Sequence, residues 1–66
     1  MEITVNGEQE ELTAATNLID FLEAKELDLD KLVIEYNQEI VKAAEWSEIT
    51  LAGGDQLEIL KFVGGG

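Results

Sequence analysis

The stretch QLEILKFV, residues 56–63, decides the fold, because it has the pattern of a β-strand with apolar side chains on both faces. Alternate residues point to opposite faces of a strand. Leu57 and Ile59 therefore share one face with Lys61, and Leu60 and Phe62 share the other with Glu58. A strand that is apolar on both faces is expected between two neighbours rather than at a sheet edge. We predict an interior strand at this end of the chain.

The first residues predict a β-hairpin. Residues 1–6, MEITVN, alternate apolar and polar side chains, as expected for a half-buried strand. The pair Asn6-Gly7 favours the positive φ angles of a tight hairpin turn. On the returning strand, Leu12 and Ala14 are expected to face inward.

A helix is predicted after the hairpin. Thr16 is the predicted N-cap, since its hydroxyl could accept a hydrogen bond from the first helical turn. Leu18, Phe21 and Leu22 are spaced i, i+3 and i+4, which places them on one helix face. The helix is expected to fade between residues 25 and 27.

The middle of the chain predicts a strand pair. LVIEY, residues 32–36, is rich in β-branched and aromatic residues, although the pattern leaves its inward face undecided. Asn37-Gln38 predicts a turn before a short strand around residues 40–41. Residues 43–52 are expected to be irregular or a single helical turn, with Trp46 and Leu51 covering the core.

This order of elements predicts an α+β fold. A hairpin, one helix, a strand pair and a final strand fit a mixed sheet of four to five strands, with the one main helix packed on one face. The first and last strands would run parallel, because the intervening elements supply the long crossover that parallel strands require. This is the β-grasp arrangement. We expect one domain over residues 1–63 and a flexible glycine tail over residues 64–66.

The charge of the chain indicates what kind of partner it suits. Fifteen carboxylates against four lysines give a formal net charge of −11. Such a surface repels nucleic acid and anionic membranes and attracts basic protein surfaces, although acidic surfaces also serve solubility alone. No apolar run reaches the roughly 18 residues that a membrane span needs. With Met1 followed at once by strand-like sequence, we expect a cytoplasmic protein.

Side-chain chemistry is narrowly limited. The chain has no His and no Cys, so the common nucleophile–base pairs cannot form, and we predict neither a catalytic residue nor a metal site. Ser47 is expected in a turn or cap. The distinctive group left is the Gly66 carboxylate, which would need activation, for example as an acyl-adenylate. Gly64 and Gly65 have no side chains that would prevent threading into a narrow slot of another enzyme. The alternative is a linker remnant or disordered end.

The second half of the sequence resembles one known family. The residues that carry the resemblance are Asn37, Glu39-Ile40-Val41, Trp46, Leu51, Gly54-Asp55, Leu57-Glu58-Ile59 and Phe62-Val63-Gly64-Gly65-Gly66. This pattern resembles the ThiS family of bacterial sulfur carriers of thiamin biosynthesis, and the resemblance extends over essentially the whole chain. One departure is Lys42-Ala43, where family members often have Pro and a basic residue.

The resemblance implies a ubiquitin-like fold and a role as a substrate rather than an enzyme. In this family a ThiF-type enzyme adenylates the terminal glycine, here Gly66, using ATP and magnesium. Sulfur from a persulfide donor then replaces AMP, which leaves a thiocarboxylate, and a ThiG-type thiazole synthase takes up the sulfur. The chain itself would bind no cofactor.

Two other functions remain open. The small subunit of molybdopterin synthase shares the fold, the diglycine end and the thiocarboxylate, but its members tend to be longer and have a proline-containing segment before the glycines. The chain could also be an acidic β-grasp module that binds partners without covalent chemistry. In each case the exposed apolar positions on the helix-free sheet face are the expected docking patch, with Phe62, Leu60 and Tyr36 as candidates.

Overall fold

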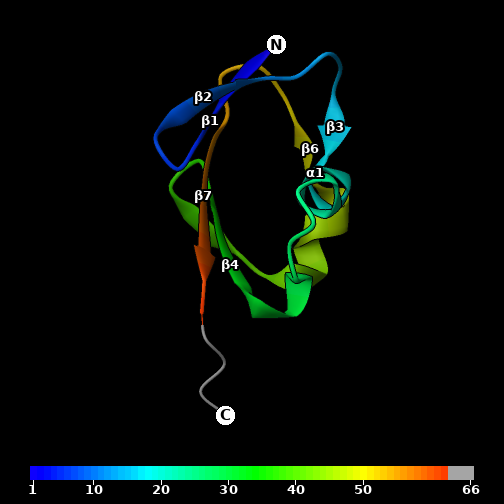
Figure 1. Cartoon of the computed structure of the whole chain (residues 1–66), viewed down its shortest axis with the longest axis vertical. Helices are drawn as coiled ribbons and strands as arrows, with labels where there is room; N and C mark the ends of the chain where they lie inside the picture. Colours follow the sequence, from blue (N-terminus) through cyan, green and yellow to red (C-terminus); the bar gives the residue numbers. More distant parts are fainter. Residues whose placement is uncertain (63–66) are drawn as a thin grey trace.

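The computed structural model describes residues 1–62, and its main feature is one mixed five-stranded sheet (Figure 1). In spatial order the strands are β2 (Glu8–Glu11), β1 (Glu2–Val5), β7 (Gln56–Lys61), β4 (Leu32–Tyr36) and β5 (Glu39–Val41). β1 and β7 run parallel, and the other neighbouring pairs are antiparallel. This confirms both the interior position of the last strand and its parallel pairing with the first.

One helix, α1 (Leu18–Ala24), packs on one face of this sheet. Leu18, Phe21 and Leu22 are buried, as their spacing predicted. Their neighbours in the core come from every central strand. The buried core comprises Ile3, Val5, Leu18, Phe21, Leu22, Leu32, Ile34, Trp46, Leu51 and Leu57. No helix in the described part of the chain is long and apolar enough to cross a membrane.

The prediction that Thr16 caps α1 is wrong, because Asn17 is the cap. The Asn17 side chain accepts a hydrogen bond from the backbone N–H of Ile19 at 2.9 Å and donates another to the Ser47 carbonyl at 2.8 Å. Thr16 belongs to a short strand, and its hydroxyl donates back to the Ala14 carbonyl instead. The strand pairing moves the start of the helix by one residue, so the second of two suitable residues becomes the cap.

This assignment of the cap predicts different effects for two neighbouring substitutions. Asn17→Ala should cost about 1 kcal/mol, because it removes an N-cap, and in a domain of this size that lowers the Tm by about 4–8 °C. Thr16→Ala should cost less than about 0.5 kcal/mol, as for most partly exposed positions. Thermal melts of both variants check this. A larger loss for Thr16→Ala would contradict the assignment.

A second, two-stranded sheet was not predicted. It pairs β3 (Thr16–Asn17) with β6 (Thr50–Leu51). Between β5 and β6, residues Ala43–Glu48 form the 3-10 helix η2, which at about three residues per turn is longer than the single helical turn that the sequence allowed. The other short 3-10 helix, η1, spans Leu29–Lys31. Because β3 and β6 have two residues each, no alternation was available to reveal them.

Trp46 and Leu51 cover the core, as predicted. Both are buried, and the Trp46 indole N–H donates to the Val41 carbonyl at 3.1 Å. The expectation that Leu12 and Ala14 face inward on the returning strand is only half right. β2 ends at Glu11, so both residues follow it, and while Leu12 packs partly against the core, Ala14 is exposed.

Both predicted hairpin turns are present and have the backbone angles that such turns require. Asn6 and Gly7 have φ values of 51° and 84°, and Asn37 and Gln38 have 49° and 72°. Positive φ at both central residues is the hallmark of the turn that matches the right-handed twist of a hairpin. Both turns therefore fix the register of the strands they join.

Candidate functional site

The last strand remains hydrogen-bonded to its neighbour in the sheet up to Phe62, the last described residue. The backbone N–H of Phe62 donates to the Lys31 carbonyl at 3.1 Å, one residue beyond the end of β7. This bond continues the pairing of β7 with β4. The predicted tail and its candidate residues Gly64, Gly65 and Gly66 lie outside the described residues. The structure shows the segment that precedes them, which is β7 and Phe62.

The helix-free face of the sheet carries an exposed apolar patch beside this segment. On β4 and β7, Val33 lies directly opposite Leu60. Leu60 is 53% exposed and Phe62 48%, and Ile40 on the neighbouring β5 is 72% exposed. We call Val33, Ile40, Leu60 and Phe62 the helix-free patch. A small acidic protein that leaves three large apolar side chains this exposed near one end of a sheet has a surface suited to a protein partner.

Two carboxylates lie next to the helix-free patch and face each other. Glu35 on β4 is directly opposite Glu58 on β7, and Ile40 on β5 is opposite Glu35 in turn. Neither carboxylate forms an ion pair with another described residue. Like charges directly opposite in a sheet are destabilising. A cation from outside would relieve this repulsion.

Tyr36 does not belong to the helix-free patch, so its expected placement there is wrong. It shares the face of Leu32 and Ile34, both buried, and is directly opposite buried Leu57. This also settles the inward face of residues 32–36, which the sequence left undecided. Tyr36 is the last residue of β4 and packs partly against the core.

The Tyr36 hydroxyl ties the end of β4 to the turn before β7. It donates to Asp55 at 2.9 Å, and the same carboxylate accepts from the backbone N–H of Ala52 at 2.8 Å and the side chain of Asn37 at 3.2 Å. Burial raises the pKa of Tyr36 above its usual 10.0, and the hydrogen bond to Asp55 and its negative charge raise it further. The network therefore fixes the end of β4 to the turn before β7. The Tyr36 phenol in it is protonated.

The raised pKa of Tyr36 predicts how stability responds to alkaline pH. Since the folded state keeps this proton to higher pH than the unfolded state, stability is present in full below about pH 10 and falls as pH rises above it. The chain has one tyrosine, so Tyr36→Phe should remove the loss of stability that ionisation of Tyr36 causes. Urea unfolding at several pH values between about 8 and 11 tests it. If wild type and Tyr36→Phe lose stability in parallel, Tyr36 does not titrate as described.

The described residues offer a surface suited to a protein partner. Ser47 is exposed in η2, where its carbonyl accepts from Asn17. Among residues 1–62, no buried side-chain nitrogen or oxygen lacks a hydrogen-bond partner. The fold and surface together define a class: a small acidic β-grasp protein with an exposed apolar sheet face beside the end of its last strand.

Comparison with known proteins shows the family within this class. The sequence model of the ThiS family matches residues 3–66, so the chain belongs to the ThiS family. It is 32% identical over 65 residues to the sulfur carrier protein ThiS of Bacillus subtilis, covering 97% of this chain and 98% of that protein. The crystal structure of the thiamine biosynthesis protein ThiS from Geobacter metallireducens is 29% identical and superimposes with a TM-score of 0.86, with all of both chains covered.

A different kind of relative is a larger protein. The chain is 33% identical over 66 residues to the thiazole synthase of Paramagnetospirillum magneticum, and it spans 20% of that protein's length. The family resemblance and the ubiquitin-like β-grasp fold expected from the sequence are confirmed. By family, the chain is a small sulfur carrier of thiamine biosynthesis rather than an enzyme itself.

Proposed function

We propose that this protein carries sulfur as a thiocarboxylate on Gly66 and donates it for thiazole formation in thiamin biosynthesis. The carboxylate would first be adenylated by a ThiF-type enzyme that uses ATP and magnesium, and sulfur from a persulfide donor would then displace AMP. The observation that carries the proposal is that the ThiS family match runs through to Gly66. The absence of Cys from the chain is consistent with sulfur carried on the carboxyl group.

Gly64 and Gly65 have the role of passing Gly66 into the active sites of the partners. A residue without a Cβ meets the fewest steric obstacles in a narrow channel. The recipient of the sulfur would be a ThiG-type thiazole synthase. This is supported by the thiazole synthase relative, in which a segment similar to the whole of this chain is part of the same polypeptide. Since ATP is required for activation, the proposal places the carrier in the cytoplasm.

The helix-free patch is the proposed docking surface for the activating enzyme. Leu60 and Phe62 would supply apolar contact directly before the tail. Glu35 and Glu58 would accept a cationic side chain of the partner, which would relieve the repulsion between them. The net charge of −11 would steer the carrier toward such a basic surface. Tyr36 has no place in this surface, since its hydroxyl is bound to Asp55.

This role for the paired carboxylates predicts effects of opposite sign on folding and docking. Glu58→Gln should raise the free energy of unfolding by a few tenths of a kcal/mol, up to about 1 kcal/mol, because it removes the repulsion with Glu35. The same change should weaken binding to the activating enzyme. Urea unfolding and calorimetric titration measure the two effects. If affinity is unchanged, the partner places no cation between the two carboxylates.

A growth experiment tests the proposed pathway. Expression of the chain in a bacterium that lacks its own thiamin sulfur carrier should restore growth without thiamin. The matched control is a strain that lacks the small subunit of molybdopterin synthase, in which the chain should restore no molybdoenzyme activity. Rescue of the second strain and not the first would favour the molybdopterin role. Rescue of neither, with the protein present and folded, would favour a noncovalent binding module.

A further inference from the structure

The backbone groups of β7 point alternately to its two neighbours. Phe62 bonds to Lys31 and Gln56 to Asn37, both on the β4 side. Because the alternation is strict in an antiparallel pair, the N–H and C=O groups of residues 57, 59 and 61 point the other way, toward β1. The bond from Asn6 N–H to the Leu57 carbonyl at 2.8 Å confirms this direction.

β1 does not reach far enough to pair with all of these groups. It ends at Val5, opposite Leu57, whereas β7 continues to Lys61. Figure 1 shows the second half of β7 extending past the end of the β1–β2 hairpin. At Ile59 the Asn6 side chain takes the place of a strand: its Oδ1 accepts from the N–H at 2.7 Å and its Nδ2 donates to the C=O at 3.3 Å.

Lys61 is the next residue on this side, and no residue between 1 and 62 pairs with it there. Within residues 1–62 its backbone N–H and C=O have no hydrogen-bond partner, although they point along the sheet as the groups of Ile59 do. An unpaired N–H and C=O of this kind can accept an added strand. The gap left by the short β1 is therefore an open sheet edge, located directly before the C-terminal segment.

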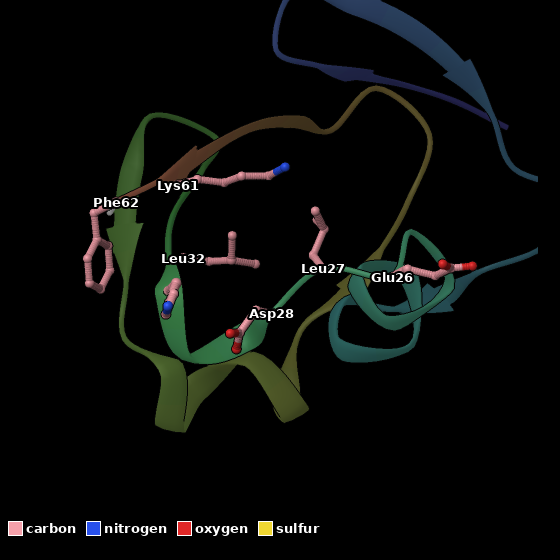
Figure 2. A pocket seen from close by; sticks show the side chains of 7 residues that line it. Glu26, Leu27, Asp28, Leu32, Lys61 and Phe62 are labelled. Carbon is pink, nitrogen blue, oxygen red and sulfur yellow. The ribbon is translucent and has the colours of Figure 1, made fainter. Parts of the chain in front are cut away.

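Two hollows on the helix side of the sheet flank this edge. One of about 330 Å³ lies between Leu27, Leu32 and Lys61, and Figure 2 shows these side chains around it. The other, of about 290 Å³, is bounded by Asn6, Ile59 and again Leu27 and Lys61. The lining of the second hollow is mixed: Leu27 and Ile59 supply apolar surface, and most of the other side chains around it are charged. A side chain of an added strand that faces this side would lie in the second hollow.

We propose that the open edge of β7 at Lys61 binds an extended segment of the enzyme that activates Gly66, by strand addition. This inference rests on the proposed function. The segment would pair with the N–H and C=O of Lys61 and place an apolar side chain in the second hollow, over Leu27 and Ile59. It would carry a carboxylate near the Lys61 amine, which has no ion pair among the described residues.

Charge favours a partner over a second copy of the chain at this edge. Of the other charged groups around the second hollow, Lys25 is paired with Glu10 at 2.9 Å, and Glu8 has no ion pair among residues 1–62. An incoming carboxylate therefore has one cation available, Lys61. Two copies that each carry a charge of −11 repel one another over their whole surfaces. The activating enzyme must also bind the chain close to Gly66, and Lys61 lies only five residues before it.

The decisive variant is Lys61→Pro, with Lys61→Ala as its matched control. Proline removes the N–H that points to the open edge and leaves the bonds of Leu60 and Phe62 to β4 intact, as proline at a strand edge does. Both variants lack the amine. We expect Lys61→Pro to lower kcat/KM for thiocarboxylate formation about tenfold below Lys61→Ala, corresponding to about 1.4 kcal/mol. Equal values for the two folded variants would overturn the proposal and leave the proposed function standing.

Hydrogen exchange on the wild-type chain gives a test that needs no variant. The Lys61 amide should exchange fast in the free protein and slowly once the activating enzyme and Mg-ATP are added, whereas the Ile59 amide is already protected by Asn6. An unchanged Lys61 amide in the bound state would refute strand addition. Protection that rises with carrier concentration alone would show that a second copy takes the edge. Failure of the wild-type chain to form any thiocarboxylate would instead refute the proposed function.

Discussion

Removal of Gly65 and Gly66 is expected to abolish sulfur transfer completely while the fold survives. The truncated chain would end on Gly64, so its carboxylate would fall short of the reacting atoms by two residues, about 7 Å of extended chain. A misplacement of even 1 Å at a reacting centre can cost a hundredfold in rate. Intact-mass spectrometry after incubation with the activating enzyme, ATP and a sulfur source should show no product.

The thermal melt is the control for this truncation. In the part of the chain that the structure describes, the buried core lies between Ile3 and Leu57, so the Tm of the truncated chain should stay close to that of wild type. A large fall in Tm would show that the glycines support the fold. Thiocarboxylate formation by the truncated chain at the wild-type rate would show that Gly66 is not the activated residue.

Leu60→Glu should have the second largest effect, by preventing docking at the helix-free patch. Leu60 is half exposed and adjacent on its strand face to Glu58, so a third carboxylate would join Glu35 and Glu58 there. Loss of a hot-spot side chain at the centre of an interface costs about 2 kcal/mol or more. We expect KM for the activating enzyme to rise about tenfold or more, as measured by the rate of AMP formation over a range of carrier concentrations.

Ala14→Glu is the matched control for Leu60→Glu. It adds the same charge at an exposed position outside the sheet, so it changes the net charge equally and leaves the helix-free patch intact. Its KM should stay within about twofold of wild type, as for most surface changes away from an interface. A similar rise in KM for both variants would mean that overall charge, and not the patch, controls docking.

The main sheet could be predicted from the sequence because residues 1–6 and 56–63 alternate clearly between their two faces. Residues 32–36 are rich in β-branched and aromatic residues, which identifies a strand but leaves its inward face undecided. The start of the helix could not be placed to the residue, since Thr16 and Asn17 are both good caps and the choice depends on the pairing of β3 with β6. That pairing is a tertiary contact between segments more than thirty residues apart.

The candidate docking surface was only partly predictable for the same reason. Leu60 and Phe62 share a face of one strand, so their common exposure follows from period two. The placement of Tyr36 needed the inward face of β4, and the pairing of Glu35 with Glu58 needed the register between two strands. Neither can be read from one segment alone. The pair Asn6-Gly7 predicted a turn. That the Asn6 side chain also bonds to the backbone of Ile59 could not be predicted, because it depends on β1 ending before β7 does.

The central claim is that the Gly66 carboxylate is the sulfur-carrying group, and mass spectrometry of the intact wild-type chain tests it most directly. After incubation with a ThiF-type enzyme, Mg-ATP and a persulfide donor, the chain should gain the mass that corresponds to one oxygen replaced by sulfur. Fragmentation should place that change on Gly66. An unchanged mass, with the enzyme shown to be active on another carrier, or a sulfur located on any other residue, would contradict it.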